Sequence, residues 1–335
     1  MEYRILGKTG LKISRLGFGG IPIQKIDAEG TRLLMEQLVA EGVNYIDTAR
    51  AYTVSEEYLG YALQGIRQHF VLATKSMART AEAMAKDIDL SLAKLQTDYI
   101  DLYQIHNPNA KDFEAVQAPG GALEALQAAK QAGKIGHIGI TLHSVALFEK
   151  AVELPWVETI MFPYNIVETQ GEELIVKCAE KNIGFICMKP LAGGAIDDAT
   201  TALRFIGSNP NVTVVIPGMA DPKEIRQNID AISNTAPLTD GEQAKIREIR
   251  DFLGTNFCRR CNYCAPCTVG INIPATFLIE GYYSRYHLKD WAEFRYGNLD
   301  KKASDCIGCG VCEDRCPYNL PIREMMKNVK EVFGK

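Results

Sequence analysis

The amino-acid sequence predicts an α/β protein with two parts, a closed eight-stranded barrel and a small cysteine-rich domain. Two observations support this prediction in a chain of 335 residues. Residues 1–250 alternate short β-branched runs with longer segments of helical period, and the last quarter gathers eight of the ten cysteines in two tight groups. We therefore expect one domain over residues 1–250 and a second domain over residues 251–335.

Eight runs in the first domain have the composition of buried strands. Each run is nearly continuous in apolar residues, as expected of parallel strands that helices cover on both faces. The expected strands are Ser14–Gly20, Asn44–Ala49, His69–Ser76, Tyr99–His106, His137–His143, Thr159–Asn165, Gly184–Pro190 and Thr213–Gly218. Eight strand–helix units in about 250 residues match the size of a (β/α)8 TIM barrel.

The segments between these strands have the period of amphipathic helices. Thr80–Gln96 is the clearest, since Met84, Ile88, Leu92 and Leu95 fall on one face. Two further expected helices are Ser55–Gln64 and Gly121–Ala132.

An open doubly wound sheet is the competing architecture. Its first strand–helix turn requires the spacing G-x-G-x-x-G, which the run Gly17-Phe18-Gly19-Gly20 does not complete. The segment Arg4–Ile13 has Lys8-Thr9-Gly10 between two β-prone runs, so we expect a hairpin that closes the bottom of the barrel. The closed barrel is therefore the favoured fold.

Two groups of cysteines have the spacing of iron–sulfur ligands. The second group has the bacterial ferredoxin pattern C-x2-C-x2-C-x3-C-P, in which the fourth cysteine often ligates the other of two clusters. We therefore expect a ferredoxin-like domain with two 4Fe–4S clusters and with Cys267 and Cys316 as candidates for this exchange. The eight expected ligands are Cys258, Cys261, Cys264, Cys267, Cys306, Cys309, Cys312 and Cys316.

Structural zinc and disulfides explain these cysteines less well. A zinc ion takes two separated cysteine pairs, and disulfides need an oxidising compartment. Residues 1–20 contain no basic-then-apolar signal segment, so a cytoplasmic location is the default expectation. Cys178 and Cys187 stand alone in apolar contexts, and we expect both to be small core side chains.

Composition excludes several classes of partner. The net charge of −4 provides no basic field for a nucleic acid. The chain contains no stretch of about 18 uninterrupted apolar residues, so no membrane span is expected.

Polar side chains occur where three consecutive expected strands end. Asp47 ends the second strand and Tyr52 follows it, Lys75 ends the third, and His106 ends the fourth. Each has a structural alternative, such as a helix cap for Asp47, a solvated lysine for Lys75 or a core histidine for His106. Active sites of such barrels lie at the carboxyl ends of the strands, so all four together indicate an active site there.

Several motifs at these positions resemble the aldo-keto reductases over about residues 1–250. They are GKTGLKISRLGFGG near the start, DTARAY followed by Ser55-Glu56, the strand ends ATKS and LYQIH, and the late elements KPLAGG and VIPGM with IRQN. Together with the cysteine groups, they make the chain similar to the iron–sulfur-fused branch of that family.

The resemblance implies a role for each polar residue at the strand ends. Tyr52 would be the general acid, Lys75 paired with Asp47 would activate it, and His106 would orient a substrate carbonyl. An ordinary phenol titrates near pH 10, and a neighbouring ammonium favours the phenolate and lowers that pKa. The implied reaction is reduction of a small aldehyde or ketone, or oxidation of the alcohol, with NAD(P)H.

The resemblance also implies a dinucleotide site. Glu224 lies where many NADP-dependent relatives have a basic residue, which favours NADH, although Lys223 and Arg226 are close in sequence. The amide clamp of the family is incomplete, because Thr141-Leu142 replaces a Ser-Asn pair and Met161 replaces a glutamine, and Met188 lies where many relatives stack a tyrosine on the nicotinamide ring. The implied nucleotide contacts are Thr141, Asn165, Lys189, Pro190, Gly193, Gly194, Gly218, Met219, Gln227 and Asn228.

The clusters admit three roles, namely structural stabilisation, electron transfer with a ferredoxin-like partner, and redox sensing. Two alternative functions therefore remain beside carbonyl reduction, an electron-transfer protein and a non-catalytic nucleotide or redox sensor. Thr239–Leu253 predicts a charged amphipathic helix between the domains. The aromatic residues of Ile273–Trp291 are expected to form a cluster shield or a domain-interface core, with a substrate wall at the barrel mouth as the alternative.

Overall fold

The chain forms two compact units in a computed structural model that describes residues 1–334. The first unit comprises Met1–Asn165, Thr169–Pro190 and Ala199–Leu238. The second comprises Ile166–Glu168, Leu191–Asp198 and the chain from Thr239 onward. The contacts thus divide the chain after Leu238, and the domain boundary expected at residue 250 stays a prediction.

The first unit is a (β/α)8 barrel, as the sequence predicts. Its eight strands are parallel and follow one another around the sheet in chain order. The Gly17 amide donates to the Val215 carbonyl over 2.8 Å and the Gly19 amide to the Pro217 carbonyl over 2.9 Å, which closes the barrel between its first and last strands. The strands are β3 (Phe18–Gly19), β4 (Tyr45–Asp47), β5 (Val71–Ser76), β6 (Ile100–His106), β7 (Ile135–Thr141), β8 (Thr159–Pro163), β9 (Gly184–Met188) and β10 (Val214–Val215).

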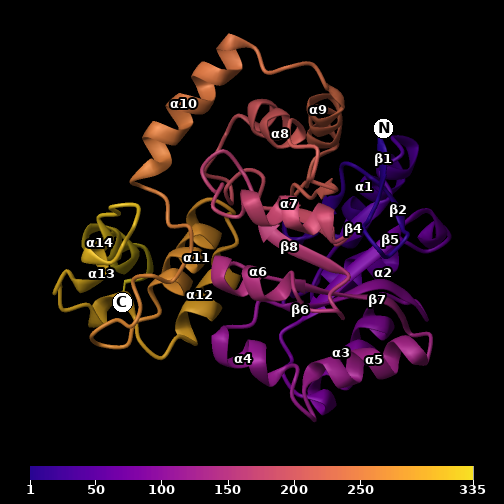
Figure 1. Ribbon diagram of the computed structural model, residues 1–335, viewed down its shortest axis with the longest axis horizontal. Helices are drawn as coiled ribbons and strands as arrows, with labels where there is room; N and C mark the ends of the chain where they lie inside the picture. Colours follow the sequence, from indigo (N-terminus) through magenta and orange to yellow (C-terminus); the bar gives the residue numbers. More distant parts are fainter. Residues whose placement is uncertain (335) are drawn as a thin grey trace. The chain divides into compact units, whose positions relative to one another are not determined.

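Helices alternate with the strands and surround the barrel, with α3 beside α5 and α8 beside α9 (Figure 1). The predicted face of α3 is confirmed, since Met84, Ile88 and Leu95 are buried and Leu92 packs against the core. The helices are α1 (Ala28–Ala40), α2 (Ser55–Ala62), α3 (Ala81–Lys94), α4 (Ala110–Ala115), α5 (Ala122–Gln131), α6 (Val145–Ala151), α7 (Glu172–Glu180), α8 (Ala199–Gly207) and α9 (Pro222–Ser233). Two 3-10 turns occur at Pro22–Lys25 and Arg67–His69.

The predicted N-terminal hairpin is present and closes one end of the barrel interior. Strands β1 (Tyr3–Ile5) and β2 (Lys12–Ser14) pair in antiparallel register. Leu6 and Ile13 are fully buried and share one apolar cluster with inward residues of the barrel strands, such as Leu102. The carboxyl ends of the strands therefore lie at the opposite rim, which this hairpin leaves uncovered.

Glu158, just before β8, provides a test of acid stability. Burial opposes its ionisation, but hydrogen bonds from His137, Lys130 and the Ile138 amide lower its pKa to about 2. Because the folded pKa lies below the ordinary value of 4.5, this stabilisation is complete above about pH 4.5 and is lost as the pH falls towards 2. We expect Glu158→Gln to lower the free energy of unfolding at pH 7 by about 1 to 3 kcal/mol.

Urea unfolding at pH 7 and at pH 3.5 measures this effect. The difference between Glu158→Gln and the wild-type protein should shrink at the lower pH, and an undiminished difference would contradict the ionic explanation. Glu153→Gln is a suitable control, because Glu153 lies on the surface in an exposed pair with Lys181 that should contribute little.

The second unit is helical. It contains α10 (Asp240–Gly254), α11 (Ile273–Ser284), α12 (Lys289–Gly297), a 3-10 turn at Ala303–Asp305, α13 (Val311–Asp314) and α14 (Ile322–Phe333). The predicted helix between the domains is confirmed as α10, with a capping box formed by Thr239 and Glu242 at its start.

The aromatic segment forms part of the core of the second unit itself, and the expected domain-interface core or cluster shield stays a prediction. Phe277 and Tyr282 are buried in the apolar cluster of the second unit, and Tyr283, Tyr286 and Trp291 pack against it. The ring centroids of Tyr282 and Trp291 are 4.5 Å apart. Five of the cysteines pack against the same cluster. The aromatic side chains and these cysteines therefore share one apolar core.

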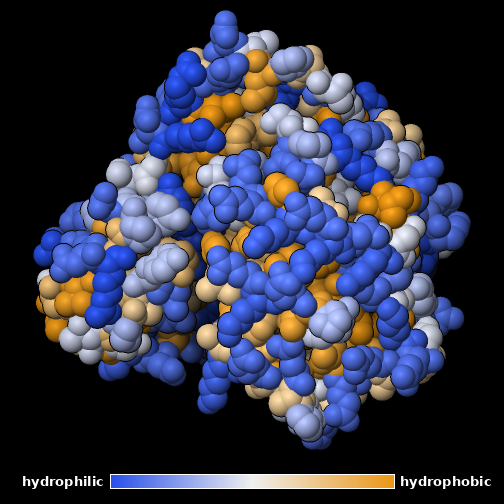
Figure 2. Space-filling view, viewed as in Figure 1, coloured by the Kyte–Doolittle hydropathy of each residue, from blue (hydrophilic) through white to orange (hydrophobic). Residues whose placement is uncertain are grey.

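The visible surface is mostly hydrophilic, with hydrophobic side chains scattered among charged ones (Figure 2). Among the described residues, no helix combines the length and apolar character that a membrane crossing requires.

Candidate functional site

Four side chains meet at the carboxyl rim of the barrel. Asp47 is the last residue of β4, Lys75 lies near the end of β5, and His106 is the last residue of β6. Tyr52 lies in the loop between β4 and α2. Parallel strands present their carboxyl ends on one side, so the topology brings residues far apart in sequence to one place.

Lys75 and Asp47 form a buried ion pair. The Lys75 ammonium donates to Asp47 Oδ2 and, over 2.8 Å, to the Thr48 carbonyl. Lys75 is 1% exposed and Asp47 2%, so water scarcely reaches the pair. On the other side, Gln104 Nε2 donates to Asp47 Oδ1 over 3.1 Å.

Burial and pairing act in opposite directions on both groups. Burial lowers the pKa of Lys75, and the Asp47 carboxylate partly restores it. Burial raises the pKa of Asp47, and Lys75 and Gln104 counter that rise. Each charge therefore depends on the other, as expected for an ion pair removed from water.

Tyr52 and His106 complete the group. The Lys75 ammonium lies 4.9 Å from the centroid of the Tyr52 ring. The rings of Tyr52 and His106 are 6.2 Å apart between centroids and nearly perpendicular, at 89°. Tyr52 and His106 are both half-buried, whereas the ion pair lies below the surface. The structure thus brings together all four residues that the sequence singles out at the strand ends.

Residues 15–201 match the sequence profile of the Aldo/keto reductase family. The chain belongs to the aldo/keto reductase family. Residues 257–321 of this reductase match a 4Fe-4S dicluster domain, and the chain is therefore an oxidoreductase with an iron–sulfur domain.

Known relatives agree with this assignment. L-galactose dehydrogenase of Arabidopsis thaliana is 26% identical over 307 residues, which is 76% of this chain and 94% of that protein. Aldo-keto reductase YhdN of Bacillus subtilis is 31% identical over 229 residues, covering 60% of this chain and 66% of that protein. The structure of the holo form of aldo-keto reductase AKR11C1 from Bacillus halodurans superimposes with a TM-score of 0.65 at 26% identity, covering 74% of this chain and 96% of that one.

Sequence reasoning missed Gln104 in this reductase. Gln104 lies opposite Lys75 in the register of β5 and β6 and is fully buried. Side chains alternate along a strand, so Leu102, Gln104 and His106 share the inward face. A polar residue at an inward position of an otherwise apolar strand was the available signal.

The residues expected to contact a nucleotide lie at the ends of later strands and on α9. The Thr141 hydroxyl accepts a hydrogen bond from the Asn107 amide over 3.0 Å, and Asn165 Nδ2 donates to the Lys189 carbonyl over 2.9 Å. Lys189 has a positive φ of 55°, and Pro190, which follows it, is buried. The first contact joins the end of β7 to the residue after β6, and the second joins the segments that follow β8 and β9.

The expected adenosine contacts differ in their exposure. Gly218 is exposed, whereas Met219 is fully buried in the core and can offer a nucleotide only its main chain. Asn228 is 3% exposed, and Gln227 Nε2 lies 3.4 Å from the Thr200 hydroxyl. A nucleotide could therefore use the exposed backbone at Gly218 and the polar end of Gln227.

The two glycines of the expected pyrophosphate loop lie in the segment Leu191–Asp198, which belongs to the second unit. Gly193 and Gly194 have φ values of 67° and 80°, which other residues rarely adopt. The Gly193 carbonyl accepts a hydrogen bond from Arg285 Nε over 3.1 Å. The two glycines thus form a turn that few other residues could adopt.

Four of the expected cluster ligands line one narrow cavity of the second unit. They are Cys267 from the first group and Cys306, Cys309 and Cys312 from the second. Among the described residues, no three His, Cys, Asp or Glu side chains converge on a single metal ion. The thiolates of a four-iron cluster bind separate iron atoms and so lie farther apart than the ligands of one ion. A cavity lined by four thiols therefore fits a cluster better than it fits a single ion.

The remaining cysteines lie near one another as well. Burial raises the pKa of the Cys261 thiol, and the neighbouring Cys316 raises it further. Burial also raises the pKa of Cys264 to about 12, with contributions from Cys258 and Cys261. Thiols that raise one another's pKa need a metal's positive charge to ionise together.

Cys178 and Cys187 belong to the barrel core, as predicted. Both are fully buried, and burial raises the pKa of Cys178 to about 12. A thiol in such surroundings is inert.

Proposed function

We propose that this protein reduces small aldehydes or ketones with NAD(P)H, using Tyr52 as the general acid. The main support is the buried Lys75–Asp47 pair, whose ammonium lies 4.9 Å from the centroid of the Tyr52 ring. Burial of an ion pair costs stability. A role in activating a proton donor therefore explains the buried cation beside the phenol better than a role in packing does.

Each residue of the site has one part in the proposed reaction. When bound, the nicotinamide supplies a hydride to the carbonyl carbon of the substrate. Tyr52 donates its phenolic proton to the carbonyl oxygen as negative charge develops there. Lys75 stabilises the phenolate that remains, Asp47 keeps Lys75 charged and oriented, and His106 orients the carbonyl beside the Tyr52 ring.

We favour NADH over NADPH. The Glu224 carboxylate accepts hydrogen bonds from the amides of Ala220 and Asp221 at the start of α9. Its negative charge would repel a 2′-phosphate and suits a free ribose. Lys223 and Arg226 are the cations next to Glu224 in sequence that would instead attract a 2′-phosphate. Arg226 pairs with Glu41 over 3.4 Å.

We propose that the second unit holds two 4Fe–4S clusters with exchanged ligands. One cluster would take Cys267, Cys306, Cys309 and Cys312, which line a common cavity. The other would take Cys258, Cys261, Cys264 and Cys316, since Cys316 lies near Cys261.

A second function, electron transfer with a ferredoxin-like partner, is favoured by one observation. Cys309 is exposed, and its neighbour Ile307 is 64% exposed. A cluster ligated there would lie near the surface, where solvent exposure helps to set its potential. Structural and sensing roles for the clusters make no such demand on exposure.

One anaerobic experiment tests both functions. The protein is purified without oxygen, its iron and sulfide are measured, and it is titrated with NADH and with NADPH before a screen of carbonyl and alcohol substrates. Carbonyl turnover with unchanged cluster absorption supports the reductase, whereas bleaching by NADH alone supports electron transfer. A clear preference for NADPH would overturn the nucleotide assignment.

Substitution of one exchanged ligand tests the cluster assignment. We expect Cys267→Ser to lose about half of the bound iron, because only the cluster of the second cysteine group loses a ligand. Cys178→Ser should retain all the iron, since Cys178 lies in the barrel core. Iron content and the electron paramagnetic resonance spectrum of the reduced protein measure the effect, and full iron content in Cys267→Ser would refute Cys267 as a cluster ligand.

A further inference from the structure

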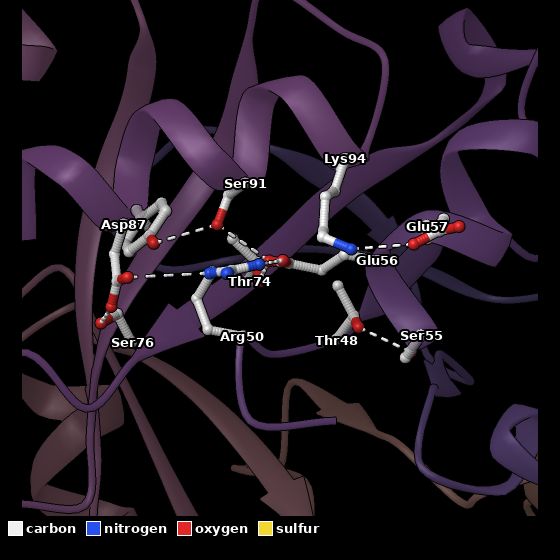
Figure 3. A network of polar contacts seen from close by, with 11 residues as sticks. Thr48, Arg50, Ser55, Glu56, Glu57, Thr74, Ser76, Asp87, Ser91 and Lys94 are labelled. Carbon is white, nitrogen blue, oxygen red and sulfur yellow. Dashed lines mark hydrogen bonds and ion pairs between the residues drawn. The ribbon is translucent and has the colours of Figure 1, made fainter. Parts of the chain in front are cut away.

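A buried carboxylate, Glu56, lies four residues after Tyr52 at the start of α2. It is 1% exposed and accepts three hydrogen bonds. The donors are the Thr74 hydroxyl over 2.7 Å, the Ser91 hydroxyl over 2.9 Å and the guanidinium of Arg50. Figure 3 shows these groups converging from the loop, β5 and α3. The proposed acid–base chemistry uses none of them.

A second carboxylate extends this network along β5. The Ser76 hydroxyl donates to Asp87 of α3, and Arg50 Nε lies 3.8 Å from Asp87 Oδ1. Thr74 and Ser76 flank Lys75 in sequence, and neighbouring side chains of a strand point to opposite faces. The network therefore holds β5 from the outer face at the two positions on either side of Lys75 (Figure 3).

The loop that contains Tyr52 is attached to the same strand. The Thr48 amide donates to the Ala73 carbonyl over 2.9 Å and the Arg50 amide to the Lys75 carbonyl over 3.0 Å. At the far end of the loop, the Ser55 hydroxyl lies 2.7 Å from that of Thr48. Tyr52 thus lies between two anchored ends.

The residue after Tyr52 has a conformation that needs such anchoring. Thr53 has a φ of 43°, in the left-handed region that β-branched residues rarely adopt. Its side chain is exposed to solvent, and its hydroxyl donates to Gln24 Oε1 over 2.7 Å. Such a conformation persists only where the surrounding structure enforces it.

We propose that Glu56, through Arg50 and Thr74, is a positioning residue that holds Tyr52 in register with Lys75. This inference rests on the proposed role of Tyr52 as the proton donor. Glu56 is not among the residues proposed to contact substrate or nucleotide. Its carboxylate joins the loop of Tyr52, through Arg50, to the strand of Lys75, through Thr74.

Glu56 also acts on Lys75 through space. Asp47 from β4 contacts the Lys75 ammonium, the Tyr52 ring lies beside it, and Glu56 from α2 acts on it more weakly from the other side of the strand. Burial lowers the pKa of Lys75, and both carboxylates raise it. Loss of the Glu56 charge should therefore let Lys75 lose its proton at a lower pH.

The test is Glu56→Gln, with Glu57→Gln as the matched control. Glu57 is the next residue, is exposed, and pairs with Lys94 over 2.8 Å (Figure 3). We expect Glu56→Gln to lower kcat about 10- to 100-fold, as for a small displacement of a reacting group, with KM unchanged within about twofold. The alkaline limb of its kcat profile should move to lower pH. Glu57→Gln should match the wild-type protein in all three measurements.

Hydrogen exchange gives a readout that does not need turnover. The amides of residues 49–55 should exchange faster in Glu56→Gln than in the wild-type protein or in Glu57→Gln. If no carbonyl compound is turned over by the wild-type protein, the proposed function fails, and exchange alone then decides the positioning role. A folded Glu56→Gln protein with wild-type kcat, or with wild-type exchange in this loop, would overturn the inference.

A milder variant covers the case in which Glu56→Gln does not fold. Ser91→Ala removes one of the three hydrogen bonds to Glu56 and leaves its charge and its pair with Arg50 intact. We expect a several-fold fall in kcat at unchanged KM, together with faster exchange in residues 49–55. Wild-type values for both in Ser91→Ala would then refute the proposal.

Discussion

Replacing Tyr52 with phenylalanine is expected to lower kcat for carbonyl reduction by about 10²- to 10⁴-fold, the usual contribution of a positioned general acid. Phenylalanine keeps the ring beside the Lys75 ammonium and removes only the hydroxyl group. The proposed nucleotide contacts lie on other strands, so the dissociation constant for the nucleotide should stay within about twofold.

Stopped-flow or steady-state reduction of a carbonyl substrate, with a separate fluorescence titration of the nucleotide, measures the two effects. Tyr61→Phe is the control, because the Tyr61 hydroxyl donates to Glu29 on the surface of the barrel unit. Unchanged turnover in Tyr52→Phe would remove this residue from the mechanism.

Breaking the ion pair from one side should cost far more stability than removing it from both sides. Lys75→Met leaves the Asp47 carboxylate buried without its cation, and we expect a loss of about 3 to 5 kcal/mol in the free energy of unfolding. In Lys75→Met/Asp47→Asn neither charge remains, and the side-chain oxygen of the introduced asparagine can still accept from Gln104. That protein should recover most of the loss, and it should be inactive because the phenol has lost its cation.

The pH dependence of stability gives the sign of the pair's contribution. The pKa of Lys75 is lowered from 10.5, so below that value the unfolded chain binds more protons at this site, and stability rises as the pH approaches 10.5. The pKa of Asp47 is raised from 3.8, so stability falls as the pH rises just above 3.8. Both pKa shifts favour the uncharged form of the group in the folded protein. The two charges therefore lower the free energy of unfolding at neutral pH.

Anaerobic urea unfolding of the cluster-loaded protein, followed by far-ultraviolet circular dichroism, measures these differences across pH. The double variant should have a flatter pH dependence in both windows than the wild-type protein. If Lys75→Met proves as stable as the wild-type protein, the pair is not the buried, mutually dependent couple described above.

Much of the barrel could be predicted because its pattern is local. Each strand is an apolar run bounded by polar residues. This composition can be recognised without knowing which strands lie beside it in the sheet. The strand ends were less predictable. The run Thr213–Gly218 contains only the two-residue strand β10, and its later residues join the first strand through an isolated bridge between Gly19 and Gly218. Helix α10 likewise extends through Gly254, one residue beyond its expected end.

The residues of the site also differ in how well the sequence predicts them. Asp47, Tyr52, Lys75 and His106 were visible in the sequence because each follows or ends a strand. Gln104 and the network around Glu56 were not, since the bonds of Glu56 to Thr74 and Ser91 and of Gln104 to Asp47 join residues 18 to 57 positions apart. The proximity of Cys267 to the second cysteine group also depends on how the chain returns over about 40 residues, which spacing alone leaves open.

The sequence by itself determined the class of fold, the eight thiols available to iron and the identity of the four polar groups at the rim. These depend on residue type and on short spacings. Only the tertiary structure decided which carboxylate meets which cation, because burial and distance set the sign and strength of those interactions. It also decided that Glu56 faces Arg50 and Thr74, whereas its neighbour Glu57 pairs with Lys94 at the surface. Because consecutive residues of a helix point in different directions, a single step along α2 separates a side chain in the interior from one in water.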